Sequence, residues 1–296
     1  MEKPQSFFKY TGAHGGRLLL ENQTLKWSRP SEFNDPFDMQ IDLLIGELDE
    51  KEIETKVLEH IYKQFEYDGE ISEKDMLGNL VRELKRINPR IKVSDVANSL
   101  ALGLPDHFKS LPSLIAKYEP EIKGLMETTK VLCLSEVSDD LLMWSHYADS
   151  HRGVVFEFIN IPELDSPYSV SEPVRYGDDV PISYDTQTVA NMLIGDTLED
   201  EHRMRDNFLY TKSKDWAYER EWRISSGDGR NPDEAFEFIP FGAKELSAVY
   251  FGCKMSEEDK AFCIKLILEK YPHVVVYQAQ KVRGKFALEF KKVEVK

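Results

Sequence analysis

Short hydrophobic runs near both ends of the chain predict strands. Apolar and aromatic residues cluster at positions 6–10 and 25–28, and runs of this length and composition are typical of strands. Between them, Gly15 and Gly16 open a segment, residues 17–22, that is long enough for one or two turns of helix. Toward the C-terminus the pattern predicts a strand, a helix and two further strands, at residues 248–252, 256–270, 273–278 and 286–290.

The pattern becomes helical between residues 47 and 123. Apolar residues recur at every fourth position from Ile53 to Phe65, as on the buried face of an amphipathic helix. Pro105 and Pro112 are predicted to separate the helices of this region, because proline removes a backbone hydrogen bond from a helix interior.

The middle of the chain returns to strand-like runs at residues 130–135 and 153–158, on either side of a helix predicted at 139–149. The remaining elements are predicted as a strand, a helix and two strands, at residues 174–176, 188–209, 222–225 and 236–239. This order predicts a single α+β domain over residues 1–296, with a central, mostly antiparallel sheet and an inserted helical lobe at residues 47–123.

The composition is that of a folded, acidic protein. Its 38 Lys and Arg against 53 Asp and Glu give a formal net charge of −15, which favours solubility and disfavours non-specific binding to nucleic acid. The three cysteines have no CxxC spacing, so neither a disulfide framework nor a zinc site is predicted. Nothing resembles a signal peptide, and no apolar run approaches the roughly 18 to 20 residues of a membrane span. We therefore expect a cytoplasmic protein with no membrane partner.

The strongest candidate for chemistry is the segment from Asp215 to Arg223. If it is extended, Glu219, Glu221 and Arg223 share one face of the strand. Two neighbouring carboxylates repel each other and raise one pKa unless a cation such as Arg223 lies near. The row fits a polar cleft, and it equally fits an exposed strand edge with alternating charge; the aromatic residues within the segment indicate that at least one face is buried.

Two further segments contain candidate residues. In residues 142–153 the Trp144, His146 and Tyr147 side chains are suited to stacking on an adenine or nicotinamide ring, although a core helix explains this segment equally well and is favoured when it is taken alone. In residues 27–38 an Asn-Asp-Pro sequence begins at Asn34 and indicates a structural turn.

These segments together carry a resemblance to a known family. Four motifs, Lys9-Tyr10 and residues 33–38, 142–153 and 216–223, occur in an order similar to that of the bacterial domain-of-unknown-function family twenty-nine seventy-one, over nearly the whole chain. Some members of that family are described as abortive-infection or phage-defence proteins. The resemblance therefore implies a role in antiviral defence, plausibly as a toxin.

The sequence also resembles, more weakly, the ADP-ribosyltransferases. Those enzymes use a basic residue on the first strand, a Ser or Tyr region on the second and a late Glu-x-Glu, and the matching positions here are Lys9-Tyr10, Ser135 with Tyr147, and Glu219-x-Glu221. The resemblance implies an ADP-ribosyltransferase-like sheet, NAD as substrate, Glu221 as the catalytic carboxylate, Glu219 orienting the acceptor, and stacking by Tyr147 or Trp144. The residues predicted to bind NAD are Lys9, Tyr10, Asn34, Ser135, Trp144, His146 and Arg223. The first strand departs from the family pattern, because Lys9 and Tyr10 stand where an Arg or His is usual.

Three functions remain open from the sequence. The first is an NAD-using transferase that modifies a protein or nucleic-acid acceptor. The second is a non-enzymatic module of a defence system that senses a phage component or binds a partner protein, such as an antitoxin or sensor, through its helical lobe. The third is a Mg²⁺-dependent nuclease using Asp35, Asp38, Glu219 and Glu221, although no spacing requires a metal and no metal site is predicted. The GxxxxGK[ST], GxGxxG, HExxH and GxSxG motifs are absent, which argues against P-loop, Rossmann, zinc-protease and serine-hydrolase chemistry.

Overall fold

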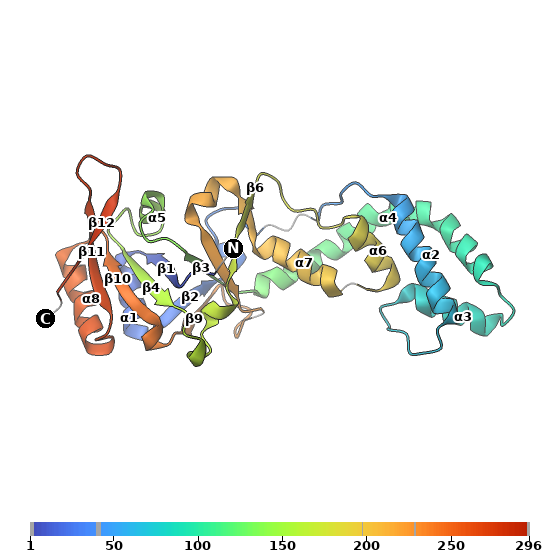
Figure 1. Ribbon diagram of the computed structural model, residues 1–296, viewed down its shortest axis with the longest axis horizontal. Helices are drawn as coiled ribbons and strands as arrows, with labels where there is room; N and C mark the ends of the chain where they lie inside the picture. The colour runs from blue at the N-terminus through green and yellow to red at the C-terminus, as the bar shows by residue number, and fades with distance from the viewer. Residues whose placement is uncertain (1–2, 40–42, 197, 228, 295–296) are drawn as a thin grey trace. The chain divides into compact units, whose positions relative to one another are not determined.

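The chain forms two compact units in the computed structural model, which describes residues 3–39, 43–196, 198–227 and 229–294 (Figure 1). The first, here called the sheet unit, comprises Met1–Met39, Leu125–Asp178 and Leu209–Lys296; the second, the helical unit, comprises Gln40–Gly124 and Asp179–Phe208. The predicted α+β class is confirmed. None of the helices in the described parts of the chain is both long and apolar enough to cross a membrane.

One large sheet organises the sheet unit, in the order β12-β11-β10-β4-β1-β3-β2-β9, with β8 on β3 and β5 on β8. Neighbouring strands are antiparallel except for the parallel pair β10–β11, so the mostly antiparallel sheet is also confirmed. The strands are β1 (Ser6–Thr11), β2 (Thr24–Ser28), β3 (Val131–Ser135), β4 (Val154–Ile159), β5 (Glu172–Pro173), β8 (Glu221–Ser225), β9 (Phe236–Pro240), β10 (Leu246–Phe251), β11 (Val275–Lys281) and β12 (Leu288–Lys292). A separate parallel pair joins β6 (Arg175–Gly177) and β7 (Thr211–Ser213).

Helices pack against this sheet through small and apolar residues. The helices of the unit are α1 (Ala13–Asn22), α5 (Leu141–His146) and α8 (Glu257–Lys270), and its 3₁₀ turns are η1 (Pro30–Glu32), η2 (Pro162–Leu164), η3 (Pro167–Val170), η4 (Lys214–Glu219) and η5 (Ala243–Glu245). Leu19 and Leu20 of α1 are buried in the main core. At Gly16 an added Cβ would collide with the Val154 side chain, so glycine is what allows α1 to lie this close to β4.

Two strands, β1 and β2, pair with opposite ends of β3 and diverge between these two points. At one end of β3, Ser135 pairs with Phe8 of β1, and at the other end Val131 pairs with Ser28 of β2. Between these two points, the Lys9 ammonium donates a hydrogen bond to the carbonyl oxygen of Cys133, at 2.8 Å. A side chain thus satisfies a backbone acceptor on β3, as a buried carbonyl requires.

The helical unit contains α2 (Glu50–Glu66), α3 (Met76–Ile87), most of α4 (Val93–Thr128), α6 (Thr186–Ile194) and most of α7 (Leu198–Leu209). Ile53, Val57 and Ile61 are buried, as the pattern predicted, and Phe65 is half-buried against the same core. The unit extends beyond residues 47–123, because the later segment that contains α6 contributes Val189 and Ala190 to the same core.

The prediction that prolines separate the helices near residues 105 and 112 was wrong, since Pro105, Pro112 and Pro120 lie inside α4. A proline in a helix interior costs about 3 kcal/mol. The preceding leucines, Leu104 and Leu111, are buried in the core of the unit, and burying one leucine side chain contributes about 1.5–3 kcal/mol. Tertiary packing therefore offsets the local penalty and keeps α4 continuous.

Candidate functional site

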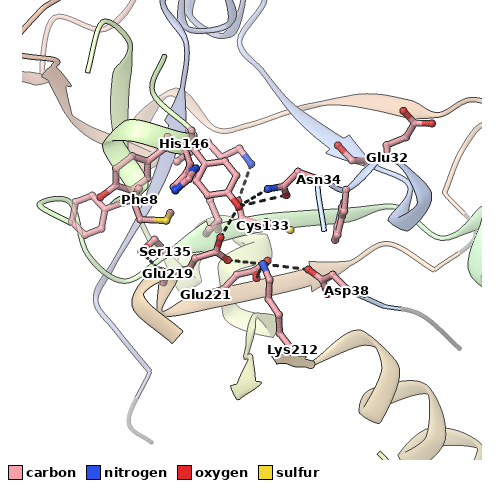
Figure 2. A pocket seen from close by; sticks show the side chains of 17 residues that line it. Phe8, Glu32, Asn34, Asp38, Cys133, Ser135, His146, Lys212, Glu219 and Glu221 are labelled. Atoms are coloured by element: carbon pink, nitrogen blue, oxygen red, sulfur yellow. Dashed lines mark hydrogen bonds and ion pairs between the residues drawn. The ribbon is translucent and has the colours of Figure 1, made fainter. Parts of the chain in front are cut away.

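A pocket of about 370 Å³ lies in the sheet unit, and its walls come from β1, β3, α5, β7 and the segments around η1 and η4 (Figure 2). Most of the residues predicted for the site line it: Lys9, Tyr10, Asn34, Ser135, His146, Tyr147, Glu219 and Glu221. The two acidic residues from late in the chain therefore face the aromatic helix from its middle across one hollow. The transferase hypothesis requires this convergence, and the roles assigned to the individual residues stay predictions.

Glu219 and Glu221 reach the pocket by a route that the sequence pattern did not predict. An extended segment from Asp215 would place Glu219, Glu221 and Arg223 on one strand face, but Lys214–Glu219 forms the 3₁₀ turn η4 and the strand begins at Glu221. Arg220, between them, has a left-handed backbone conformation with φ of 43°. This turn brings both carboxylates into the same pocket. Alternation along a strand applies only to Glu221 and Arg223, which both lie on β8.

An ammonium group sits at the centre of the acidic residues. The Lys212 Nζ is 2.6 Å from Glu219 Oε2, 3.2 Å from Glu221 Oε2 and 3.3 Å from Asp38 Oδ2 (Figure 2). All four side chains are buried, where charges are stable only when they are paired. Asp38 Oδ1 is also buried, and it has no hydrogen-bond partner among the residues that the structure describes.

Arg223 holds Glu221 from behind the pocket. Its Nε donates to Glu221 Oε1 at 2.8 Å and its Nη2 to Glu221 Oε2 at 2.9 Å, a two-pronged contact that fixes the plane of the carboxylate. The guanidinium also donates to Asp38 Oδ2 at 2.6 Å and to the carbonyl oxygen of Leu209 at 2.8 Å. Arg223 is fully buried and is not part of the pocket lining, so it positions Glu221 and does not fit the predicted contact with NAD.

The two carboxylates have opposite pKa shifts. Burial raises the pKa of Glu219, and the neighbouring Glu221 adds to this increase while Lys212 opposes it. Burial also disfavours the charged form of Glu221, but Arg223 and Lys212 outweigh it and lower the pKa of Glu221 to about 2. Glu221 is therefore a fixed anion at neutral pH, whereas Glu219 takes up a proton more readily than an ordinary glutamate.

Hydroxyl groups complete the walls of the pocket. Tyr147 donates a hydrogen bond to Glu219 Oε1 at 2.6 Å, and Asn34 donates one to the Tyr147 oxygen at 3.3 Å. Burial and the adjacent Glu219 raise the pKa of Tyr147, so its hydroxyl remains a donor. Ser135 and Tyr10 instead donate to backbone carbonyls, those of Glu219 at 2.6 Å and Val137 at 2.8 Å, and thus hold the pocket together.

Trp144 does not fit its predicted stacking role. The ring is fully buried and outside the lining, its Nε1 donates to the carbonyl oxygen of Ser138 at 2.8 Å, and His151 stacks on it with the ring centroids 6.2 Å apart. His146 does line the pocket and is exposed. Of the predicted aromatic residues on this segment, His146 and Tyr147 present their side chains to the pocket.

Sequence reasoning missed Lys212 and gave Asp38 only a part in the nuclease alternative. Lys212 precedes the predicted segment and lies on β7, outside the large sheet, so no periodicity connects it with Glu219 and Glu221. One signal was available in the sequence. Two neighbouring carboxylates that are buried require more than one cation nearby, and besides Arg223 the chain offers Lys212 a few positions upstream.

The arrangement does not favour a divalent metal. No group of three or more His, Cys, Asp or Glu side chains in the described ranges is arranged to hold a metal ion. The carboxylates of Asp38, Glu219 and Glu221 surround the Lys212 ammonium, and Asp35, the fourth residue of the nuclease alternative, accepts a hydrogen bond from the backbone amide of Phe37 at 2.9 Å. An incoming cation would have to displace Lys212.

The fold and site thus define an α+β protein with a pocket lined by two carboxylates of opposite pKa shift. Residues 143–224 match the model of a family described as Protein of unknown function (DUF2971), which confirms the predicted family resemblance over these residues; the motifs at Lys9-Tyr10 and residues 33–38 lie outside the match. The match begins within α5, at Met143, and contains Lys212, Glu219 and Glu221. No curated protein and no solved structure matches the chain.

Proposed function

We propose that the pocket is an active site that cleaves the nicotinamide–ribose bond of NAD and transfers ADP-ribose to an acceptor. The observation that carries the proposal is the pair of carboxylates with opposite pKa shifts in one pocket. Pairs of this kind divide one reaction between a fixed anion and a proton carrier. The substrate comes from the resemblance to ADP-ribosyltransferases, and the geometry supports a site with the chemistry that such a substrate needs.

Glu221 is the group that would stabilise the transition state. When the C1′–N bond breaks, its electron pair leaves with nicotinamide and positive charge develops on the ribose. A carboxylate already ionised and held in place stabilises that charge without rearranging. Arg223 holds the Glu221 carboxylate in place through two hydrogen bonds, and the low pKa of Glu221 keeps it charged.

Glu219 is suited to the proton transfer that completes the reaction. The acceptor nucleophile forms a bond to C1′ and loses a proton, and a carboxylate with a raised pKa is a better base for that proton than an ordinary glutamate. Lys212 and Tyr147 hold its two oxygens, each at 2.6 Å. His146 and Tyr147 line the same hollow and offer ring surfaces for the nicotinamide.

The biological role we propose follows from the family. Because some relatives are described as phage-defence or abortive-infection proteins, the transferase is proposed to act as a defence effector in the cytoplasm that slows growth by modifying a protein or nucleic acid. The net charge of −15 favours a protein acceptor over a polyanion. An antitoxin or sensor that binds the helical unit is the proposed means of control.

The test uses NAD labelled separately in its nicotinamide and adenylate parts, incubated with the full-length chain and with cell extract, RNA or DNA. We expect nicotinamide release and transfer of the adenylate label. Glu221→Gln should lower the rate at least about 100-fold, the scale for loss of one electrostatic group at a reaction centre. Glu219→Gln, which leaves the Arg223 contact intact, should reduce transfer by about 10²-fold or more, as expected for a general base.

A matched control is Glu157→Gln. This carboxylate lies on β4, accepts hydrogen bonds from Ser6 and Tyr250, and does not line the pocket, so its replacement should leave the rate unchanged. Circular dichroism should show that all three variants are folded. The proposal fails if the folded wild-type chain releases no nicotinamide with any acceptor, or if folded Glu219→Gln and Glu221→Gln proteins retain the wild-type rate.

A further inference from the structure

A second pocket, of about 570 Å³, lies in the sheet unit beside the first. Its walls come from β1, α1, β2 and β9, the region where β1 and β2 meet opposite ends of β3. Lys9 lines both pockets, so the two hollows adjoin at this side chain. Its lining includes Lys9, Leu18, Asn22, Lys26, Phe236 and Phe238.

The charge of this second pocket is opposite to that of the protein as a whole. Two lysines, Lys9 and Lys26, and no acidic residue line it, in a chain with a net charge of −15. The Lys26 ammonium lies 3.4 Å from the centre of the Phe236 ring, and Lys9 donates to the Cys133 carbonyl oxygen. Among the described residues, neither contact supplies a negative charge, since one is to a backbone carbonyl and the other to an aromatic ring, so both positive charges are available to an anion.

Apolar surface surrounds these two charges. Phe238 is 61% exposed and Leu18 is 39% exposed, although both belong to the lining of a pocket. Exposed phenylalanine rings beside a cation offer flat faces to a planar, apolar group. Asn22 and the neighbouring threonines at positions 11 and 24 supply a small number of hydrogen-bonding groups, as ligand pockets commonly do.

We propose that this second pocket binds the phosphorylated, flat-ringed part of a nucleotide, with the phosphate against Lys9 and Lys26 and the ring against Phe236 and Phe238. Two sources share this chemistry: the adenylate half of NAD and a free adenine nucleotide. Only the first source rests on the proposed function, because there the nicotinamide half would occupy the neighbouring carboxylate pocket.

The electrostatics of Lys9 agree with this assignment. Burial lowers the pKa of Lys9, and the nearby Lys26 adds to the decrease, while the negative charge of Glu221 opposes it. An anion between the two lysines would relieve their mutual repulsion and favour the charged form of Lys9. The carboxylates of the first pocket would repel the same anion. This repulsion would keep the phosphate in the second pocket and away from the reaction centre.

Equilibrium binding to the full-length chain tests the proposal, with adenosine 5′-monophosphate as the probe and adenosine and inorganic phosphate as its two halves. Isothermal titration calorimetry should show that the monophosphate binds at least about tenfold more tightly than either half. Lys26→Gln and Phe238→Ala should each weaken its binding about tenfold, since one removes the charge and the other a ring face. Lys85→Gln is the matched control: that ammonium lies 4.8 Å from the centre of the Phe65 ring in the helical unit, and its loss should change nothing.

The outcomes separate this proposal from the proposed function. Absence of monophosphate binding, or binding unaffected by both Lys26→Gln and Phe238→Ala, would overturn it, and so would phosphate binding as tightly as the monophosphate. Binding that persists in a chain without NAD cleavage supports the pocket and removes the transferase. Competition by NAD, together with a raised KM for NAD in Lys26→Gln, identifies the adenylate half of NAD as the source; binding without competition identifies a free nucleotide.

Discussion

The two pockets that meet at Lys9 differ in how their charges are balanced. In the first, Lys212 and Arg223 are paired with Asp38, Glu219 and Glu221 at 2.6–3.3 Å. In the second, the two lysines have no carboxylate in the lining. A buried set of charges that compensate one another holds its geometry without a ligand. Cations without a carboxylate partner are stabilised when an anion binds beside them.

This difference assigns different tasks to the two pockets. Compensation fixes Glu221 as an anion and leaves Glu219 with a raised pKa, which are conditions for chemistry. The two lysines of the second pocket, which have no carboxylate partner, provide affinity for an anion. They do not form a pair of acid and base groups like Glu219 and Glu221.

Removing Arg223 should have the largest effect on the first pocket. Arg223→Met leaves Glu221 and Asp38 buried without their main partner, and breaking a buried ion pair in this way costs about 3–5 kcal/mol. Denaturant unfolding at neutral pH measures the loss. Arg220→Met is the control, because Arg220 is 60% exposed and lies 3.7 Å from its partner Glu136, so it should cost less than about 1 kcal/mol. Equal losses from both variants would contradict the compensated network.

Acid should weaken the first pocket through Glu221. The pKa of this carboxyl is about 2 in the folded protein and 4.5 for an ordinary glutamate, so its stabilising contribution is complete above about pH 4.5 and is lost as the pH falls toward 2. The difference in unfolding free energy between wild type and Glu221→Gln should therefore shrink by about 3 kcal/mol over that interval. A difference that stays constant would contradict the lowered pKa. Glu219, with its raised pKa, contributes with the opposite sign and loses stabilisation as the pH rises.

Tyr147→Phe should have a smaller effect that is confined to activity. The variant removes the hydrogen bond to Glu219 Oε1, and since that bond lowers the pKa of Glu219, its loss raises this pKa further. The acidic limb of the rate–pH profile for ADP-ribose transfer should move to higher pH, with a rate loss of about tenfold, the scale of one hydrogen bond to a charged group. Tyr10→Phe, which removes a bond to a backbone carbonyl, should leave the position of that limb unchanged. A shared shift in both variants would mean that Tyr147 has no specific influence on Glu219.

The sequence was sufficient for the parts of this site that depend on local pattern. Runs such as 130–135 and 153–158 predicted β3 and β4. The grouping of Tyr147 with Glu219 and Glu221 came from the resemblance to ADP-ribosyltransferases, and all three residues line the first pocket. The sequence was insufficient where tertiary packing decides. The left-handed turn at Arg220, the course of α4 through Pro112 and the position of Lys212 on a separate strand pair depend on contacts with residues distant in the chain, which no local period encodes.

Lys9 provides the smallest but most discriminating test, because it is shared by both pockets. Lys9→Met keeps the length of the side chain and removes the donor to the Cys133 carbonyl, which should lower the unfolding free energy by about 1 kcal/mol, the value of one hydrogen bond. The same variant should weaken monophosphate binding and also raise KM for NAD, whereas Phe33→Leu, which alters the first pocket only, should spare monophosphate binding. If Lys9→Met affected stability and neither ligand, the two hollows would be joined by a structural lysine, and the contrast between their charges would not extend to what they bind.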